Sequence, residues 1–227
     1  MAAQLSLLSL PVAIIPVTLN RKVYIVLLKN NCSMIEPFVA KRFLLFQEET
    51  AIQRMLSTLF LYPEMEFTLS ELAKQARVSK SSASRLLQML KTAGFIHVID
   101  KGIVFRIRSN TESFEYRKRK IAHNLMALYE SNFVEYLETF FKNPVSIVLF
   151  GSFRKGDDIS TSDIDIAVET LEEIKHEIVR PPKVESFEKL FNRKIEVHLF
   201  NRKKVDINVF NNIANGIVLS GFLEVRP

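Results

Sequence analysis

Cysteine and histidine are scarce in this sequence, and their scarcity excludes two common kinds of stabilisation. The 227 residues include one cysteine, Cys32, so the chain has no internal disulfide framework. Only four histidines accompany it, scattered along the chain, which argues against a structural zinc site. We therefore expect a cytoplasmic protein whose two small domains depend on hydrophobic cores.

The sequence also lacks a long hydrophobic run, which bears on its N-terminal region. Residues 5–19 are apolar, but they contain two prolines and are too few for a membrane helix. The cations that would precede the apolar stretch of a signal peptide, Arg21 and Lys22, follow it instead. Residues 23–28 are compatible with one strand. Two interpretations of residues 1–33 stay open: a non-native extension, or a small additional β element.

Basic residues are concentrated in the middle of the chain. Residues 41–120 contain 15 lysines and arginines against 8 aspartates and glutamates, a net charge of +7. From residue 145 to the C-terminus there are 12 basic and 13 acidic residues, a net charge of −1. This asymmetry predicts that the middle segment meets a polyanion, although a solvated protein face can carry the same excess.

The most informative stretch is residues 145–168, VSIVLFGSFRKGDDISTSDIDIAV. Its apolar, β-branched start predicts a buried strand that ends at Gly151 and Ser152, where backbone N–H groups can approach an anion. A second strand follows, and because side chains alternate along a strand, Asp163 and Asp165 share one face. Two close carboxylates repel each other unless a cation lies between them, and oxygen ligands favour Mg²⁺ shared with phosphates. The stretch therefore predicts a site for a nucleoside triphosphate.

This order of strand, Gly-Ser and Asp-x-Asp resembles the nucleotidyltransferase superfamily that includes DNA polymerase β, and especially its minimal nucleotidyltransferases. The resemblance implies a third acid on a later strand, and Glu196 within KIEVHLF fits that position. His198 shares the outward face of the same strand, where we expect a half-exposed residue without a role. The resemblance further implies that Mg²⁺ is held by Asp163, Asp165 and Glu196, with ATP as the substrate. The nucleotide-binding residues that it implies are Gly151, Ser152, Lys155 and Ser162, with Lys155 standing where the family often has arginine.

A second pattern occupies residues 68–96, TLSELAKQARVSKSSASRLLQMLKTAGFI. A capping box beginning at Thr68 predicts a short helix, and Ser79 caps a second helix that Gly94 ends. The spacing of apolar residues predicts an earlier helix in the second half of residues 40–61. Two alternating runs after Gly94, joined by Lys-Gly, predict a hairpin.

Helix, helix, turn, helix and hairpin together resemble the winged helix-turn-helix family, which implies that the last helix enters the major groove of duplex DNA. Arg77 lies in the turn where that family usually has glycine, so either Arg77 is left-handed or the turn differs. The expected DNA contacts are outward residues of that helix and two arginines of the hairpin. They are Lys80, Ser81, Ser82, Ser84, Arg85, Arg106 and Arg108. Such domains also serve as protein-interaction modules, which is the alternative interpretation.

Residues 111–141 predict one helix that connects the two domains. Its start, EYRKRK at residues 115–120, contains four cations. They either extend the DNA footprint or form a solvated face of the connecting helix.

The expected fold class is α+β. We expect an N-terminal extension at residues 1–33, a winged helix-turn-helix at 34–110 and a connecting helix at 111–142. An α/β nucleotidyltransferase-fold domain with a mixed sheet is expected at 143–227. The resemblance implies an enzyme that transfers an adenylyl group from ATP to a protein hydroxyl, as antitoxins paired with a HEPN-type toxin do. DNA binding by a homodimer would then serve self-regulation. The alternative is a transcription regulator whose nucleotidyltransferase domain only binds nucleotide or a partner protein.

Overall fold

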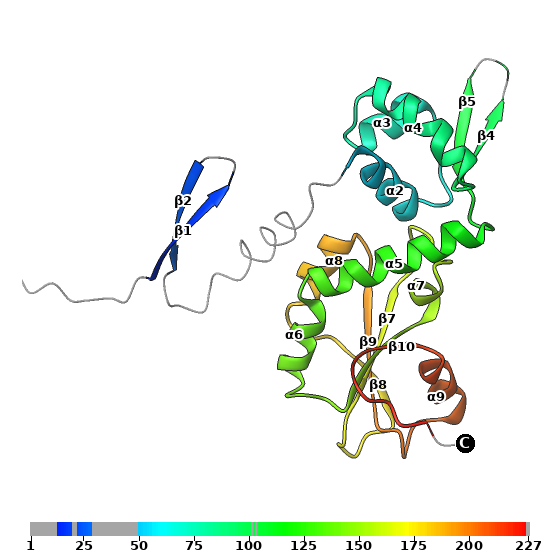
Figure 1. The fold of residues 1–227 in the computed structure, drawn as a ribbon. Helices are drawn as coiled ribbons and strands as arrows, with labels where there is room; N and C mark the ends of the chain where they lie inside the picture. Colours follow the sequence, from blue (N-terminus) through cyan, green and yellow to red (C-terminus); the bar gives the residue numbers. More distant parts are fainter. Residues whose placement is uncertain (1–12, 20–21, 29–49, 101, 103, 226–227) are drawn as a thin grey trace, which may run out of the picture. The chain divides into compact units, whose positions relative to one another are not determined.

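The structure is a computed structural model that describes residues 13–19, 22–28, 50–100, 102 and 104–225 (Figure 1). The chain forms two compact units, Met1–Lys41 and Arg42–Pro227. In the first unit, strands β1 (Ala13–Leu19) and β2 (Lys22–Leu28) pair antiparallel. The strand expected at residues 23–28 is confirmed, and the remainder of residues 1–33 lies largely outside the described residues.

The second unit begins with three helices and a small sheet. The helices are α2 (Ala51–Leu61), α3 (Leu69–Gln75) and α4 (Lys80–Thr92). The strands are β3 (Glu66–Phe67), β4 (Ile96–Asp100) and β5 (Phe105–Ser109), in the order β3-β5-β4 with antiparallel pairing. One hydrophobic core, which includes Met55, Leu72, Leu90 and Ile107, holds these elements together.

Local sequence signals set the boundaries of α3 and α4. The Thr68 hydroxyl accepts a hydrogen bond from the Glu71 N–H, and the Glu71 carboxylate accepts one from the Thr68 N–H, which confirms the capping box. Ser79 caps α4, and Gly94, at a φ of +76°, ends it as expected. Arg77 adopts the left-handed conformation, with a φ of +53°, which settles the question left open by the missing glycine.

The hairpin loop is longer than the sequence suggested. Asp100 pairs with Phe105, so four residues join β4 to β5 rather than Lys-Gly alone. Gly102, at a φ of +83°, lies within this loop. The second strand of the hairpin was expected directly after Lys-Gly, and it begins at Phe105 instead.

The single helix expected over residues 111–141 is instead two helices, α5 (Phe114–Glu130) and α6 (Phe133–Phe140). The break lies at Asn132, which has a left-handed φ of +59°, a conformation that asparagine tolerates. The buried Ser131 hydroxyl supports the break by donating a hydrogen bond to the Leu128 carbonyl. Helix α6 packs in the C-terminal core rather than serving as a linker.

The C-terminal part is built on a five-stranded mixed sheet, as expected. Its strands are β6 (Ser146–Phe150), β7 (Ile164–Glu169), β8 (His176–Val179), β9 (Ile195–Phe200) and β10 (Ile217–Gly221). They lie in the order β10-β6-β7-β9-β8, and the β7–β9 pair alone among these five is parallel. The helices of this part are α7 (Gly151–Lys155), α8 (Val184–Phe191) and α9 (Ile207–Ala214).

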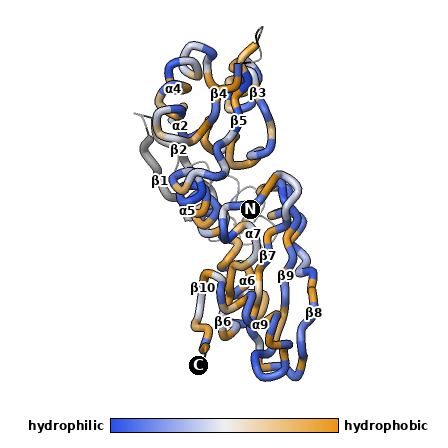
Figure 2. Tube along the Cα trace, turned by 90° about the vertical axis from the view of Figure 1, so that its right-hand side faces the viewer, coloured by the Kyte–Doolittle hydropathy of each residue, from blue (hydrophilic) through white to orange (hydrophobic). Residues whose placement is uncertain are grey.

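The two faces of this sheet bury different sets of side chains. Ile147, Ile164 and Val197 point into the larger core, which α6 and α8 complete. Val148 and Phe200 point to the opposite face and pack beneath α9. Figure 2 shows hydrophobic residues running along β6, which contributes to both cores, as β7 and β9 do. Within the described residues, no helix is long and apolar enough to cross a membrane.

Candidate active site

The parallel pairing of β7 with β9 places two acidic residues side by side. Asp165 is the direct partner of Glu196 in this register, so both carboxylates leave the sheet on the α9 face. The Asp165 side chain is 25% exposed and the Glu196 side chain 42% exposed. The two acids are therefore neighbours at a solvent-accessible part of the sheet, although thirty-one positions separate them in the sequence.

His198 joins these two acids. Its Nε2 atom lies 3.5 Å from Glu196 Oε2 and 3.9 Å from Asp165 Oδ1. One potential ligand atom from each of the three residues lies within 4.8 Å of the other two. Sequence reasoning gave His198 no role, although its position two residues after Glu196 puts both on one strand face. The sequence does show this shared face. It does not show that β9 pairs with β7, which brings His198 close to Asp165.

The electrostatics of this cluster favour a bound cation. Burial, followed by repulsion from Glu196 and Asp163, raises the pKa of Asp165 from 3.8 to about 6. Burial, followed by the neighbouring His176, lowers the pKa of His198, while Glu196 acts in the opposite direction. A divalent cation among these groups would relieve the carboxylate repulsion. The residues present therefore fit a divalent metal ion.

Gly151 provides the close backbone approach at this site. It follows Phe150, the β6 partner of Asp165, and begins α7 with a φ of +70°. A Cβ atom at this position would overlap the Asp165 carboxylate. Only glycine therefore fits both the backbone conformation and the space. Ser152 follows at the first turn of α7 and is half-buried.

The remaining expected site residues lie at the end of α7 and on the segment that joins α7 to β7. Asp163 precedes β7, is half-buried and acts on Asp165 through its charge. It borders an open depression of about 770 Å³ together with Ser162 and Lys194. The Ser162 hydroxyl accepts a hydrogen bond from the Ile159 N–H at 2.9 Å, which shapes the loop before β7. Lys155 is exposed at the end of α7.

A buried ionic cluster supports the same loop. Asp158 and Lys120 are both 1% exposed, and Lys120 Nζ lies 3.1 Å from Asp158 Oδ1. Asn124 donates a hydrogen bond to the same Oδ1 atom at 3.1 Å. Lys120 is one of the four cations at residues 115–120. Because it is buried, it belongs neither to a DNA footprint nor to a solvated face. The other three, Arg117, Lys118 and Arg119, are exposed.

Arg193 connects this loop to the N-terminal helices. Its Nη1 donates to the Ser160 carbonyl at 2.8 Å, and its Nη2 donates to the Leu61 carbonyl at the end of α2, also at 2.8 Å. Its Nη2 also lies 3.7 Å from Asp158 Oδ2. Because Arg193 precedes β9 by two residues, one side chain links α2, the loop before β7 and the start of β9.

The expected DNA contacts lie on one side of α4 and on β5. Lys80, Ser81, Ser84 and Arg85 are exposed, and Ser82 is half-buried with its N–H donating to the capping Ser79 hydroxyl. Arg108 is exposed on β5. Arg106 lies 3.3 Å from Glu71, so an exposed ion pair already engages part of its guanidinium.

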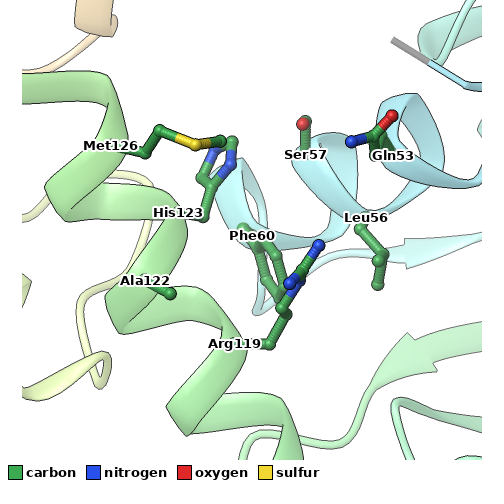
Figure 3. Close-up of a pocket in the computed structure, with 8 residues that line it drawn as sticks. All are labelled: Gln53, Leu56, Ser57, Phe60, Arg119, Ala122, His123 and Met126. Carbon is green, nitrogen blue, oxygen red and sulfur yellow. The ribbon is translucent and has the colours of Figure 1, made fainter. Parts of the chain in front are cut away.

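A separate cavity of about 210 Å³ lies between α2 and α5 (Figure 3). The figure shows the His123 ring beside Phe60 and Met126, with Arg119 on the same helix. Burial lowers the pKa of His123 to about 4. The lining contains no carboxylate, and we assign this cavity no chemistry.

Comparison with known proteins gave results of unequal weight. No curated protein matches the sequence. Among solved structures, the chain is similar to the heme sensor protein PefR from Streptococcus agalactiae in complex with heme, with 16% identity and a TM-score of 0.27. That likeness covers 48% of this chain and 82% of the other. A second structure, of PefR in complex with heme and carbon monoxide, gives the same identity and TM-score. That likeness covers 48% of this chain and 85% of the other. TM-scores of this size support no conclusion about fold or function.

The C-terminal part gives the informative match. The matching segment begins two residues before α6 and includes the strands that carry Asp165 and Glu196. It therefore starts earlier than the expected boundary at residue 143, in agreement with the packing of α6 in the C-terminal core. Residues 131–221 match the family model described as "Polymerase beta, Nucleotidyltransferase", which supports nucleotidyl transfer as the chemistry of this part of the chain.

Proposed function

We propose that this protein is a divalent-metal-dependent nucleotidyltransferase that uses ATP. The observation that carries the proposal is the register of β7 and β9, which pairs Asp165 with Glu196 beside the backbone of Gly151. The match of residues 131–221 to a nucleotidyltransferase family supports it independently.

The residues of the site have distinct roles in this proposal. Asp163, Asp165 and Glu196 hold the metal. Gly151 and Ser152 bind phosphate oxygens through their backbone N–H groups at the start of α7. Lys155 and Ser162 lie on either side of the loop that leads to β7, where they face the nucleotide. A bound divalent cation supplies charge stabilisation for the phosphates during transfer.

The reaction is an in-line displacement at the α-phosphorus of ATP. The acceptor hydroxyl oxygen forms the new P–O bond, and the bond between the α-phosphorus and the bridging oxygen breaks to release pyrophosphate. Glu196 accepts the hydroxyl proton. Its greater exposure, 42% against 25% for Asp165, is compatible with access by the acceptor from solvent.

The donor and the site are tested together with ATP labelled at the α-phosphate. Transfer of label should fall by about 100-fold or more in Asp165→Asn and in Glu196→Gln. The matched control is Glu177→Gln, which neutralises an exposed acid on β8 outside the site and should leave transfer unchanged. Undiminished labelling by the variant that combines Asp165→Asn with Glu196→Gln would contradict the assignment of the site.

The acceptor in this proposal is a hydroxyl group of a HEPN-type toxin that forms a pair with this protein. The support is the resemblance of the Gly-Ser and Asp-x-Asp pattern to minimal nucleotidyltransferases. Co-incubation of both proteins with labelled ATP should label the toxin, and mass spectrometry should find one added AMP. ATP binding without transfer to any partner would favour a regulator that only binds nucleotide.

We further propose that residues 50–110 are a winged helix-turn-helix that binds duplex DNA as a homodimer. The order of α2, α3, α4 and the β4–β5 hairpin supports this assignment. So does the exposed side of α4, where Lys80, Ser81, Ser84 and Arg85 form a cationic, hydroxyl-rich surface. Binding to its own upstream region no tighter than to random duplex would favour a protein-interaction module instead.

A further inference from the structure

The position of the His198 ring in the candidate site is unusual for a half-buried histidine. Its side chain is 12% exposed, and its Nε2 atom is buried with no hydrogen-bond partner among the described residues. Glu196 Oε2 and Asp165 Oδ1, at 3.5 Å and 3.9 Å, are farther away than the ~2.7–3.2 Å of an ordinary N–H···O bond. A buried polar atom without a partner requires an explanation.

The other nitrogen of the ring is firmly engaged. His198 Nδ1 lies 2.9 Å from His176 Nε2 on the edge strand β8, and the two rings are nearly parallel. When His198 donates its Nδ1 proton to His176, the Nε2 lone pair of a neutral imidazole points at the two carboxylates. A lone pair facing two anions is unfavourable unless a cation lies between them.

The separations suit an ion at this point. Ligand atoms ~2.1 Å from a divalent ion lie about 3.0–3.5 Å apart, depending on coordination geometry. The three ligand atoms here lie within 4.8 Å of one another, so small side-chain adjustments bring them to those separations. Asp163 is not part of this group of three, although its charge acts on Asp165.

We propose that His198 is a nitrogen ligand of the metal site and that His176 is the partner that orients it. The inference rests on the metal site of the proposed function and extends it to the choice of ion. An imidazole nitrogen suits transition metals, whereas Mg²⁺ prefers oxygen ligands alone. The site therefore favours a divalent transition metal such as Mn²⁺ over Mg²⁺.

Pulsed electron paramagnetic resonance of the Mn²⁺-loaded protein tests this directly, because a coordinated imidazole gives a nitrogen coupling. The wild-type protein should show that coupling, and His198→Gln should lose it with at least 10-fold weaker Mn²⁺ binding. His176→Gln should keep the coupling and bind Mn²⁺ about 10–100-fold more weakly, as expected for an orienting partner. His97→Gln, on the exposed side of β4, is the matched control and should change neither quantity.

A competition between the two ions adds a second readout. The preference for Mn²⁺ over Mg²⁺ should shrink by at least 10-fold in His198→Gln, because the substitution removes a ligand that Mg²⁺ uses poorly. Circular dichroism of each variant establishes that the fold is intact.

The outcomes separate this inference from the proposed function. Transfer of label with no nitrogen coupling in Mn²⁺-loaded wild-type protein would overturn the role of His198 and leave the enzyme assignment standing. Nitrogen coupling that His198→Gln abolishes, without any label transfer, would support the ligand and contradict the enzyme. A coupling that persists in His198→Gln would also overturn the inference.

Discussion

Gly151 shows how tightly a single position constrains the candidate site. Its positive φ strains any residue with a side chain, and the space a Cβ would need is occupied by the Asp165 carboxylate. The sequence indicated a close backbone approach at Gly-Ser. It could not show that the neighbour is the Asp165 carboxylate, because that contact depends on the antiparallel pairing of β6 with β7.

The first prediction separates backbone strain from this overlap. Gly151→Ala should displace Asp165, lower nucleotidyl transfer by at least 10-fold and destabilise the fold by about 1–3 kcal/mol. Gly102→Ala is the matched control, since Gly102 also has a positive φ but no atom of the described residues lies within 4 Å of the position that a Cβ would take. It should cost about 1 kcal/mol and leave transfer unchanged. Equal loss of transfer in both variants would contradict the role of the contact.

The second prediction concerns pH in the absence of metal. The pKa of Asp165 is raised to about 6 from 3.8, so the folded state holds a proton that the unfolded state releases between these values. The contribution of Asp165 to the free energy of unfolding is therefore most favourable below about pH 4. It is lost as pH rises through 6, which lowers the free energy of unfolding by on the order of 1–3 kcal/mol. With EDTA present, Asp165→Asn should raise the melting temperature relative to wild type more at pH 7 than at pH 5. A difference that is the same at both pH values would contradict this titration.

At the scale of elements, the sequence predicted those helices whose ends carry local signals. Helices α3 and α4 begin and end as expected because Thr68, Ser79 and Gly94 act on their own backbone neighbourhood. The break between α5 and α6 was missed because Asn132 carries no proline or glycine signal and the apolar spacing continues through it. The parallel pairing of β7 with β9 joins distant segments, so the strands and the shared face of Glu196 and His198 could be predicted, but the approach of His198 to Asp165 could not.

The third prediction belongs to helix α4. Arg85→Ala should weaken DNA binding and reduce the salt slope by about one unit through loss of a phosphate or base contact. If Arg85 reads a guanine edge, sequence preference should also relax by about 1–3 kcal/mol. Lys175→Ala removes an exposed cation from the C-terminal part and serves as the control in fluorescence anisotropy at fixed salt. Equal effects of both substitutions would indicate nonspecific charge attraction rather than docking of α4.

At the scale of the whole Arg42–Pro227 unit, α5 and Arg193 connect the core of the N-terminal helices to the larger core of the C-terminal sheet. Helix α5 contributes Tyr116 to one core and Leu128 to the other. Arg193 bonds the carbonyls of Leu61 and Ser160, which belong to the N-terminal helices and to the loop before β7. Sequence patterns predicted two domains joined by a helix. They did not reveal this polar connection, because a buried arginine and a surface arginine look alike in sequence.

The fourth prediction follows from that connection. Arg193→Met removes the donor from the carbonyls of Leu61, Ser160 and Asn192 and should destabilise the unit by about 2–4 kcal/mol. Calorimetry should show one unfolding transition in the wild-type protein and two separated transitions in the variant. Arg180→Met is the control, because Arg180 is 58% exposed in its ion pair with Glu188, so its loss should destabilise the unit much less than Arg193→Met does. A single transition in Arg193→Met would show that α5 alone couples the two cores.

The hydrogen bonds of Arg193 to Ser160 and Leu61 also have a consequence for how the halves of the unit respond to ligands. Ser160 lies three residues before Asp163, and Leu61 ends α2, which packs against α4. A nucleotide that shifts the loop at Ser160 therefore acts on the same guanidinium that holds the end of α2. Thermodynamic linkage makes any such coupling reciprocal. If both ligands bind as proposed, the factor by which ATP changes the affinity for duplex DNA equals the factor by which the duplex changes the affinity for ATP.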